Sequence, residues 1–254
     1  MSFSAYVALG DSQSIDLYPA LDAGRTAVSV ALERIEGAGA VAPLGAASLF
    51  YQNDGESLPD ETGNDLVSRF PGITYHRLAV DGATIGDVFG EQLALLPASD
   101  APTIVTLTIG SEDLFSAFSG APKRTLLEQI VGDLVEAYDL LIGAISATRP
   151  NSLIIATTVT DPSDRTGRIK GVLDDVSPLP LKGMYTFNDH IRDVVSGMPD
   201  VWVADAYVHF LGHGATQPEE DRWYWRRSPI ELNARGANEL RKVWMETLRG
   251  AVGE

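Results

Sequence analysis

A serine follows directly after an apolar run near the start of the chain, in the stretch YVALGDSQS. Its hydroxyl, on Ser12, can attack a carbonyl carbon if a neighbouring base takes its proton. Two of the four histidines, His209 and His213, lie in the short segment HFLGHG. A serine, a histidine and backbone amides beside glycines are the groups that acyl transfer uses. Ser12 can equally be an ordinary turn or helix-cap residue, so its surroundings decide between the two interpretations.

The elements that must position these groups follow an alternating pattern. Five short, nearly continuous apolar runs are typical of strands that are buried on both faces. They are residues 6–9, 75–80, 103–109, 153–159 and 201–204. Helical periodicity lies between them, most clearly in residues 125–148, which carry one apolar stripe and are followed by Pro150. Residues 185–197 and 235–250 also predict helices. This alternation predicts a parallel sheet covered on both faces.

The long stretch of residues 14–69 is less regular than the rest of the chain. Glycines interrupt it, and the segment YQNDGESLPDETGND is typical of a polar loop. We expect a helix and a long excursion there. Such an excursion either shapes a binding cleft or decorates the surface.

Polar residues gather where the predicted strands end. They are Asp11-Ser12, Asp81-Gly82-Ala83-Thr84, Gly110-Ser111-Glu112-Asp113, Thr160-Asp161-Pro162 and Asp205, with HFLGHG next. In a parallel sheet, ligands bind beyond the carboxyl ends of the strands. These residues are therefore expected to share one crevice.

The order of these segments resembles the GDSL or SGNH hydrolase superfamily of esterases and lipases. GDSQS resembles its nucleophile block, and AVDGAT its second block, whose glycine amide helps to form the oxyanion hole. LTIGSEDL stands where the block Gly-x-Asn-Asp belongs, and NARGANEL resembles the segment after the last block, Asp-x-x-His-Pro-Asn-x-x-Gly. The resemblance covers most of the chain. It implies one domain over residues 1–254, with an α/β, flavodoxin-like three-layer fold around a central parallel five-stranded sheet.

Two positions depart from the family pattern. Glu112 stands where the family has asparagine, and Glu231 ends the SPIE segment that replaces Asp-x-x-His. The chain is similar to a subgroup that carries HFLGHG, an aromatic WYW and IEPN-x-x-GA, here HFLGHG, WYW and IELNARGA. Glu231 is therefore expected to be a trait of that subgroup, whereas Glu112 is not.

The resemblance implies that Ser12 is the nucleophile and that its amide and that of Gly82 form the oxyanion hole. A base must then lie within hydrogen-bond reach of Ser12. We expect His213 in this role, because glycines on both sides free its loop, and His209 is the second choice. His213 can also be a plain surface histidine of that loop.

The base needs an acid that fixes its tautomer. Glu231 is the first candidate, because the subgroup places it where the usual histidine stands. Asp205 is the alternative, and its other possible role is to cap or brace the loop that follows it.

Glu112 occupies the place of the third oxyanion donor, yet an ionised carboxylate only accepts hydrogen bonds. Three explanations stay open: Glu112 is protonated and donates, it turns away while another donor serves, or the site is impaired. Asp113 is expected to accept loop amides below the site.

Four further residues are expected to contact substrate: Asp11, His209, Trp223 and Trp225. Two of them belong to the WYW segment, which forms either a wall of the crevice or part of the core. Asn233 is expected to cap the last helix.

The composition excludes several partners. The formal net charge is -16, from 19 Lys and Arg against 35 Asp and Glu, and such a surface repels nucleic acid and anionic membranes. The chain has no cysteine, which excludes disulfides and thiolate metal sites, and it has no run long enough to insert in a membrane. With no leader pattern at its start, the sequence predicts a cytoplasmic protein. No metal-ligand spacing is diagnostic, so no cofactor is expected.

The sequence thus predicts a serine hydrolase that cleaves a short acyl, aryl or carbohydrate ester through an acyl-enzyme. One alternative is a binding protein of the same fold that is catalytically impaired or inactive, which Glu112 and the missing Asp-x-x-His favour. Another is an acyltransferase that delivers the acyl group to an alcohol. The partner in each case is a small-molecule ester, and the oligomeric state is left open.

Overall fold

The centre of the molecule is a five-stranded sheet in which every neighbouring pair of strands is parallel. The structure, a computed structural model, describes residues 2–24, 43–119 and 123–254. The strands are β1 (Ala5–Gly10), β2 (Thr74–Arg77), β3 (Thr103–Thr108), β4 (Ser152–Thr157) and β5 (Val201–Ala204). Their spatial order is β2-β1-β3-β4-β5, the flavodoxin-like order. The predicted fold class is confirmed.

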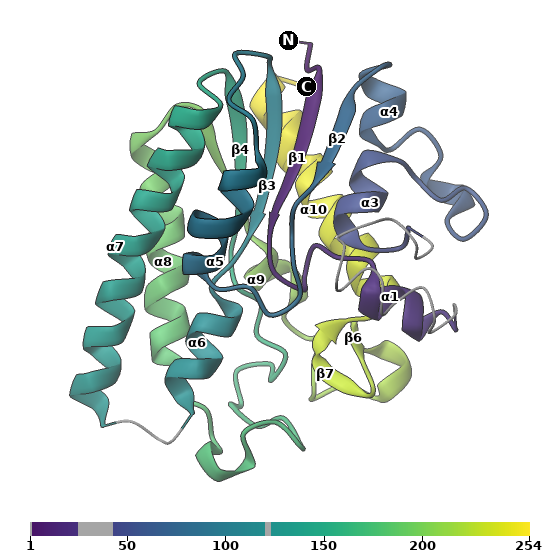
Figure 1. The fold of residues 1–254 in the computed structure, drawn as a ribbon. Helices are drawn as coiled ribbons and strands as arrows, with labels where there is room; N and C mark the ends of the chain where they lie inside the picture. The colour runs from purple at the N-terminus through teal and green to yellow at the C-terminus, as the bar shows by residue number, and fades with distance from the viewer. Residues whose placement is uncertain (1, 25–42, 120–122) are drawn as a thin grey trace.

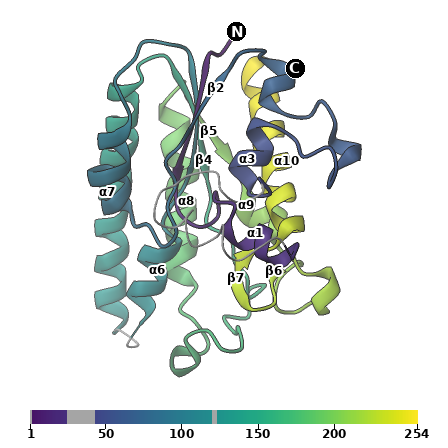
Figure 2. The same cartoon turned by 45° about the vertical axis from the view of Figure 1, so that its right-hand side comes forward.

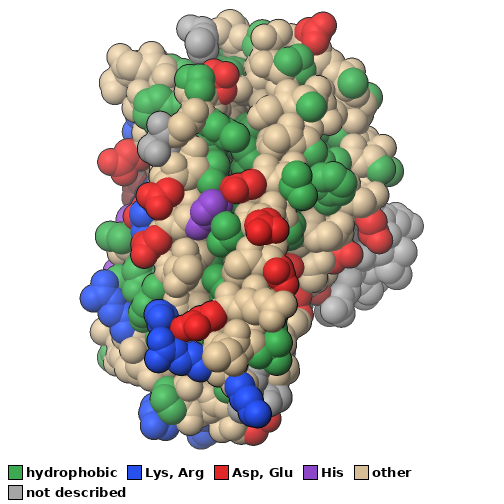
Figure 3. Space-filling view, turned by 90° about the vertical axis from the view of Figure 1, so that its left-hand side faces the viewer, with side chains coloured by type: hydrophobic (Ala, Val, Ile, Leu, Met, Phe, Trp, Pro, Cys, Tyr) green, Lys and Arg blue, Asp and Glu red, His purple; other side chains and the backbone are tan. Residues whose placement is uncertain are grey.

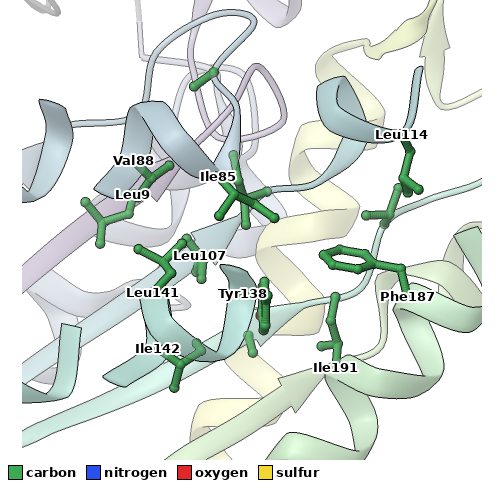
Figure 4. Close-up of a cluster of buried hydrophobic side chains, with 14 of the residues drawn as sticks. Leu9, Ile85, Val88, Leu107, Leu114, Tyr138, Leu141, Ile142, Phe187 and Ile191 are labelled. Carbon is green, nitrogen blue, oxygen red and sulfur yellow. The ribbon is translucent and has the colours of Figure 1, made fainter. Parts of the chain in front are cut away.

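Among the described residues, one face of the sheet is covered by the helices α5 (Ile85–Asp87), α6 (Ser111–Phe118), α7 (Arg124–Thr148) and α8 (Lys182–Gly197) (Figure 1). Figure 4 shows the core on this side, where Leu9 and Leu107 of the strands lie among Leu141 of α7 and Phe187 of α8. Most of the predicted stripe of α7 is buried, but Leu126 at its start is 49% exposed.

The opposite face carries the helices α1 (Leu17–Asp22), α3 (Ala46–Tyr51), α4 (Leu66–Arg69) and α10 (Ala234–Val252) (Figure 2). The strand residues that point this way, such as Tyr6 and Ile104, pack with Phe50 of α3 and Trp244 of α10. Alternate residues of each strand therefore feed two separate cores, as expected of strands buried on both faces.

Shorter elements complete the described chain. The helix α9 (Ala206–Phe210) follows β5, and β6 (Tyr224–Trp225) pairs antiparallel with β7 (Ser228–Leu232). The single turns are η1 (Pro59–Glu61), η2 (Val88–Gln92), η3 (Leu93–Leu95), η4 (Asp174–Val176) and η5 (Glu219–Asp221). The β6–β7 pair lies beside α1 below the sheet in Figure 1.

The irregular stretch of residues 14–69 contains α1, α3, η1 and α4, and its residues 25–42 lie outside the described part. A buried carboxylate, that of Asp16, joins α1 to the start of α3 within this stretch. Asp16 accepts the amide of Gly45 at 2.6 Å and the hydroxyl of Ser48 at 2.8 Å, and it pairs with Arg77 of β2. The excursion is therefore fastened at the edge of the sheet.

Charge is distributed unevenly over the face of the molecule that Figure 3 shows. Acidic side chains are scattered across this face, whereas Lys and Arg gather toward its lower end. Within the described ranges, no helix is long and apolar enough to cross a membrane.

Candidate active site

The turn after β1 is held in a fixed shape by its neighbours. Gly10 has φ +123°, and a Cβ at this position would lie 1.8 Å from the carbonyl oxygen of Thr108, so only glycine fits here. The carboxamide of Gln92 accepts the Gly10 amide and donates to its carbonyl, both at 2.8 Å. Ser12 follows in a turn that is closed by the amide of Ser14 on the carbonyl of Asp11 at 3.1 Å. The cap position of α1 is Asp16, so Ser12 is not a helix cap.

A crevice of about 220 Å³ opens beside Ser12. Residues that follow β1, β2, β3 and β4 line it, as the sequence predicts, and they include Ser12, Asp81, Gly82, Ser111, Glu112 and Thr160. Gly82 has φ +70°, a conformation that favours glycine. The other walls come from Tyr18 of α1, Phe115 of α6 and Glu231 of β7. No lysine or arginine is among the described residues that line this crevice.

The hydroxyl of Ser12 and the carboxylate of Glu231 meet in the crevice, near enough for Ser12 to lower the pKa of that carboxyl. Glu231 is only 9% exposed, and its Oε2 has no hydrogen-bond partner among the described residues. The side chain of Gln13 donates to the carbonyl of Ile230 at 3.3 Å, which ties the turn that carries Ser12 to β7. The arrangement places a carboxylate, and not an imidazole, against the serine.

Burial raises the pKa of Glu231 to about 8, and the charges of Asp11, Asp81 and Glu112 raise it as well, against the hydrogen bond from Ser12, which lowers it. Burial also raises the pKa of Asp11 to about 7. With no cation among the described wall residues to stabilise its negative charge, Glu231 holds its proton at neutral pH.

Glu112 and Asp113 open helix α6 and have different surroundings. The hydroxyl of Ser116 donates to Glu112 at 3.1 Å, so Glu112 acts here as an acceptor, the opposite of the donor role of asparagine. Asp113 accepts the amide of Ile85 at 3.1 Å, which confirms its predicted structural role. Burial raises the pKa of Asp113 to about 6.

None of the four histidines, all within the described residues, lines the crevice. The ring of His213 stacks on Trp223, with centroids 3.6 Å apart and planes at 3°. Its loop is fastened by Asp164, which accepts the amides of Gly212 at 2.9 Å and Gly214 at 3.1 Å. The structure therefore does not bring the expected base to Ser12. The loop follows β5, which is three strands from β1, or about 14 Å at usual strand spacing.

His209 and Asp205 also have partners outside the crevice. His209 lies 3.1 Å from Glu239 of α10. Asp205 caps α9 and pairs with Arg192 at 2.9 Å. Burial raises the pKa of Asp205, but the hydrogen bond and charge of Arg192 outweigh it, so that this pKa lies below its usual value. These contacts correspond to the bracing role of Asp205. They do not place Asp205 as an acid behind a catalytic histidine.

The aromatic segment divides between core and crevice. Trp223 is 5% exposed and packs with Phe210 in the core, so the expectation that it contacts substrate is not met. Trp225 is partly exposed, and its ring lies 5.8 Å from that of Tyr18, which lines the crevice. Asn233 accepts the amide of Gly236 at 2.8 Å and caps α10, as predicted.

Four residues of the crevice were expected to line it but were given no role: Asp81, Ser111, Thr160 and Pro162. Four others were not predicted there at all: Gln13, Tyr18, Phe115 and Ile230. Tyr18 and Ile230 carry no local signal, because they reach the crevice only through the course of α1 and β7. No group of three or more His, Cys, Asp or Glu within the described ranges is arranged to hold a metal ion.

The fold is shared with solved structures of low sequence identity. An extracellular lipase from Streptomyces rimosus is 17% identical with a TM-score of 0.55, over 98% of this chain and 99% of that chain. Phospholipase A1 from Streptomyces albidoflavus NA297 is 16% identical with a TM-score of 0.58, over 98% and 100%. An acetylxylan esterase from Geobacillus stearothermophilus is 14% identical with a TM-score of 0.59, over 97% and 94%. At these identities the likeness shows the fold.

No curated protein matches the chain in sequence. The family model of the GDSL-like lipases and acylhydrolases, in contrast, matches residues 6–212. The matched range contains Ser12, Gly82 and Glu112, while Glu231 lies beyond it. The chain therefore belongs to the GDSL-like lipase/acylhydrolase family and is a carboxylic ester hydrolase of the SGNH type.

Proposed function

We propose that the chain hydrolyses carboxylic esters through an acyl-enzyme on Ser12, with Glu231 as the general base. The observation that carries this proposal is that Ser12, Gly82 and Glu231 line the same crevice, where Ser12 lies near enough to Glu231 to lower the pKa of its carboxyl. The role of Glu231 thereby changes. The sequence predicts Glu231 as the acid that orients His213. In this proposal Glu231 is itself the general base, in place of the histidine.

A carboxylate can serve as this base because of its surroundings. A general base works best when its pKa lies near the working pH, and an ordinary glutamate, with a pKa of roughly 4.3, is too weak. Burial raises the pKa of Glu231 to about 8, which makes its ionised form as strong a base as an imidazole. A carboxylate has no tautomer to fix, so this site needs no third residue to orient the base.

In the proposed reaction, Ser12 Oγ attacks the ester carbonyl while Glu231 takes its proton. The carbonyl oxygen becomes an oxyanion that accepts the amides of Ser12 and Gly82. The carbon–oxygen bond to the alcohol then breaks, and Glu231 returns the proton to the leaving oxygen. A water molecule attacks the acyl-enzyme with Glu231 again as base, and the acid leaves as Ser12 regains its proton.

The oxyanion hole of this proposal has two donors. A third donor, where present, is worth roughly 2.7–4 kcal/mol of barrier. Glu112 accepts from Ser116 and lies in the same crevice. We propose that it contributes no donor and slows the reaction without abolishing it.

A short acyl, aryl or carbohydrate ester is the proposed substrate class. Structures of similar fold include an acetylxylan esterase and a phospholipase A1. Asp81, Glu112 and Glu231 line the crevice without a lysine or arginine among its described wall residues. This charge disfavours a phosphate-bearing alcohol and favours a neutral one.

A cytoplasmic location remains part of the proposal. It rests on the absence of cysteine, which suits a reducing compartment. The enzyme of similar fold from Streptomyces rimosus is described as extracellular, so fractionation of cells that express the native gene is the test.

Covalent labelling with a fluorophosphonate tests the proposed nucleophile. We expect the wild-type protein to be labelled, with labelling increasing between pH 6 and pH 9, and Ser12→Ala to remain unlabelled. His213→Gln is the matched control and should be labelled like wild type, because His213 does not line the crevice. Absence of labelling at every pH would favour a binding protein. Transfer to added alcohols in a product analysis would indicate an acyltransferase.

A further inference from the structure

A second, smaller cavity lies beside the catalytic crevice. It is about 20 Å³ in volume, and its walls are almost entirely apolar, with Leu114 and Phe118 from α6, Met184 from α8 and Ile169 from the loop after β4. Four residues line both the crevice and this cavity: Ser111, Phe115, Thr160 and Pro162. The two spaces therefore adjoin across a shared wall, and the smaller one lies on the side of the sheet that α6 and α8 cover.

The position of the proposed base indicates which side of the crevice holds the alcohol part of the ester and which side holds the acyl part. Glu231 must return its proton to the leaving oxygen, so the alcohol part of the ester lies on the side of Glu231 and Tyr18. These residues come from β7 and α1, whereas Ser111 and Phe115 belong to α6. Figures 1 and 2 show α6 on one side of the sheet end and β7 with α1 on the other. The acyl group therefore points away from β7, toward the small apolar cavity.

The size of the cavity limits what can enter it. A space of about 10–15 Å³ by this measure holds one water molecule, so a cavity of about 20 Å³ has room for a methyl or an ethyl group. Its surroundings are firmly packed, since Met184 and Ile169 are each only 4% exposed. A longer chain would have to displace buried side chains, which costs free energy in a close-packed core.

On the basis of the proposed function, we infer that this cavity is the acyl subsite and that Met184 limits the acyl group to two or three carbons. The chain is then selective for acetyl and propionyl esters, while the polar crevice of about 220 Å³ accommodates the alcohol. Met184 acts as a specificity residue, because its flexible side chain forms part of the apolar wall and carries no polar group that takes part in the reaction.

Hydrolysis of a series of 4-nitrophenyl esters tests this inference. For wild-type protein we expect kcat/KM to fall about tenfold or more from propionate to butyrate, and further to hexanoate, as an extra methylene in a tight pocket does. Met184→Ala should lower the acetate-to-hexanoate ratio at least about tenfold. Met245→Ala is the matched control, because Met245 is also buried, at 1% exposed, but in the core on the opposite face of the sheet.

The outcomes separate the subsite from the function itself. If Met184→Ala and Met245→Ala keep the wild-type chain-length profile, or if the wild type prefers hexanoate, the subsite assignment is wrong while the esterase stands. If no ester is hydrolysed in a Ser12-dependent way, the proposed function fails. Should Met184→Ala not fold, Ile169→Val removes a single methyl from the same wall, and it should extend the accepted chain to butyrate.

Discussion

Two glutamates, Glu231 in the crevice and Glu239 on α10, have very different pKa values because their surroundings differ. Glu231 lies in the crevice, where burial raises its pKa to about 8. Glu239, on α10, contacts His209 and Lys242, and the hydrogen bond from His209 together with Lys242 holds its pKa down to about 2. Both are largely shielded from water, so the difference is the cation that one has and the other lacks.

The difference favours the proposed base, Glu231, over a base from the histidine-rich segment. His209 lies 3.1 Å from Glu239, and the ring of His213 lies flat on Trp223. The crevice instead surrounds Glu231 with Asp11, Asp81 and Glu112. A carboxylate among carboxylates binds a proton strongly, which is the property that a general base requires.

The largest expected effect is on activity. Glu231→Gln removes the base while keeping the shape, and kcat/KM for a short-chain ester should fall at least about 10⁴-fold. Glu239→Gln is the matched substitution, and it should leave kcat/KM within about threefold of the wild type. A large loss in Glu239→Gln with little loss in Glu231→Gln would reverse the comparison and return the histidine segment to the catalytic role.

A second contrast should appear in the free energy of unfolding as a function of pH. The folded-state pKa of Glu231, about 8, lies above its unfolded value of 4.5, so the folded protein loses stability as pH rises through this window. Glu231→Gln should therefore match the wild type near pH 4.5 and be more stable by about 3–5 kcal/mol at pH 9.

Glu239 should behave in the opposite way. Its folded-state pKa of about 2 lies below 4.5, so its contribution is complete above pH 4.5 and is lost as pH falls toward 2. Glu239→Gln should be less stable than wild type by about 1–3 kcal/mol at pH 7, and the two should converge in acid. Urea denaturation of the three proteins at several pH values measures both effects, and parallel curves for all three would contradict the assigned environments.

The extent to which the fold follows from sequence is clearest in the strands. The apolar runs at residues 103–109 and 153–159 become β3 and β4 because the central strands are buried on both faces. The run at 75–80 is less well predicted, since β2 ends at Arg77. β2 is an edge strand that pairs with β1 alone, so its last apolar residues leave the regular ladder, and this depends on a strand order that local pattern does not contain.

The site was predictable only where one strand end determines a position. Ser12, Gly82 and Glu112 lie in the loops or helix starts that follow β1, β2 and β3, and they share the crevice as expected. His213 was expected there as well, but its loop follows the far edge strand. Glu231 was expected near the site only from the family resemblance, because its approach to Ser12 depends on the position of β7, a long-range contact with no local signal.

The smallest expected effect concerns Glu112 and its influence on the pKa of Glu231. Its charge is one of the causes that raise the pKa of Glu231, so Glu112→Asn should lower that pKa and supply an amide donor near the oxyanion. Because Glu231 must be ionised to act, wild-type activity should rise with pH through about 8, and this rise should move to lower pH in Glu112→Asn. At pH 7 the variant should be about tenfold more active than the wild type. This gain is smaller than the change in rate that one oxyanion-hole donor usually causes. If instead wild-type activity falls as pH rises and Glu112→Asn removes that fall, Glu112 is a protonated donor, and the base is not the group that limits the rate.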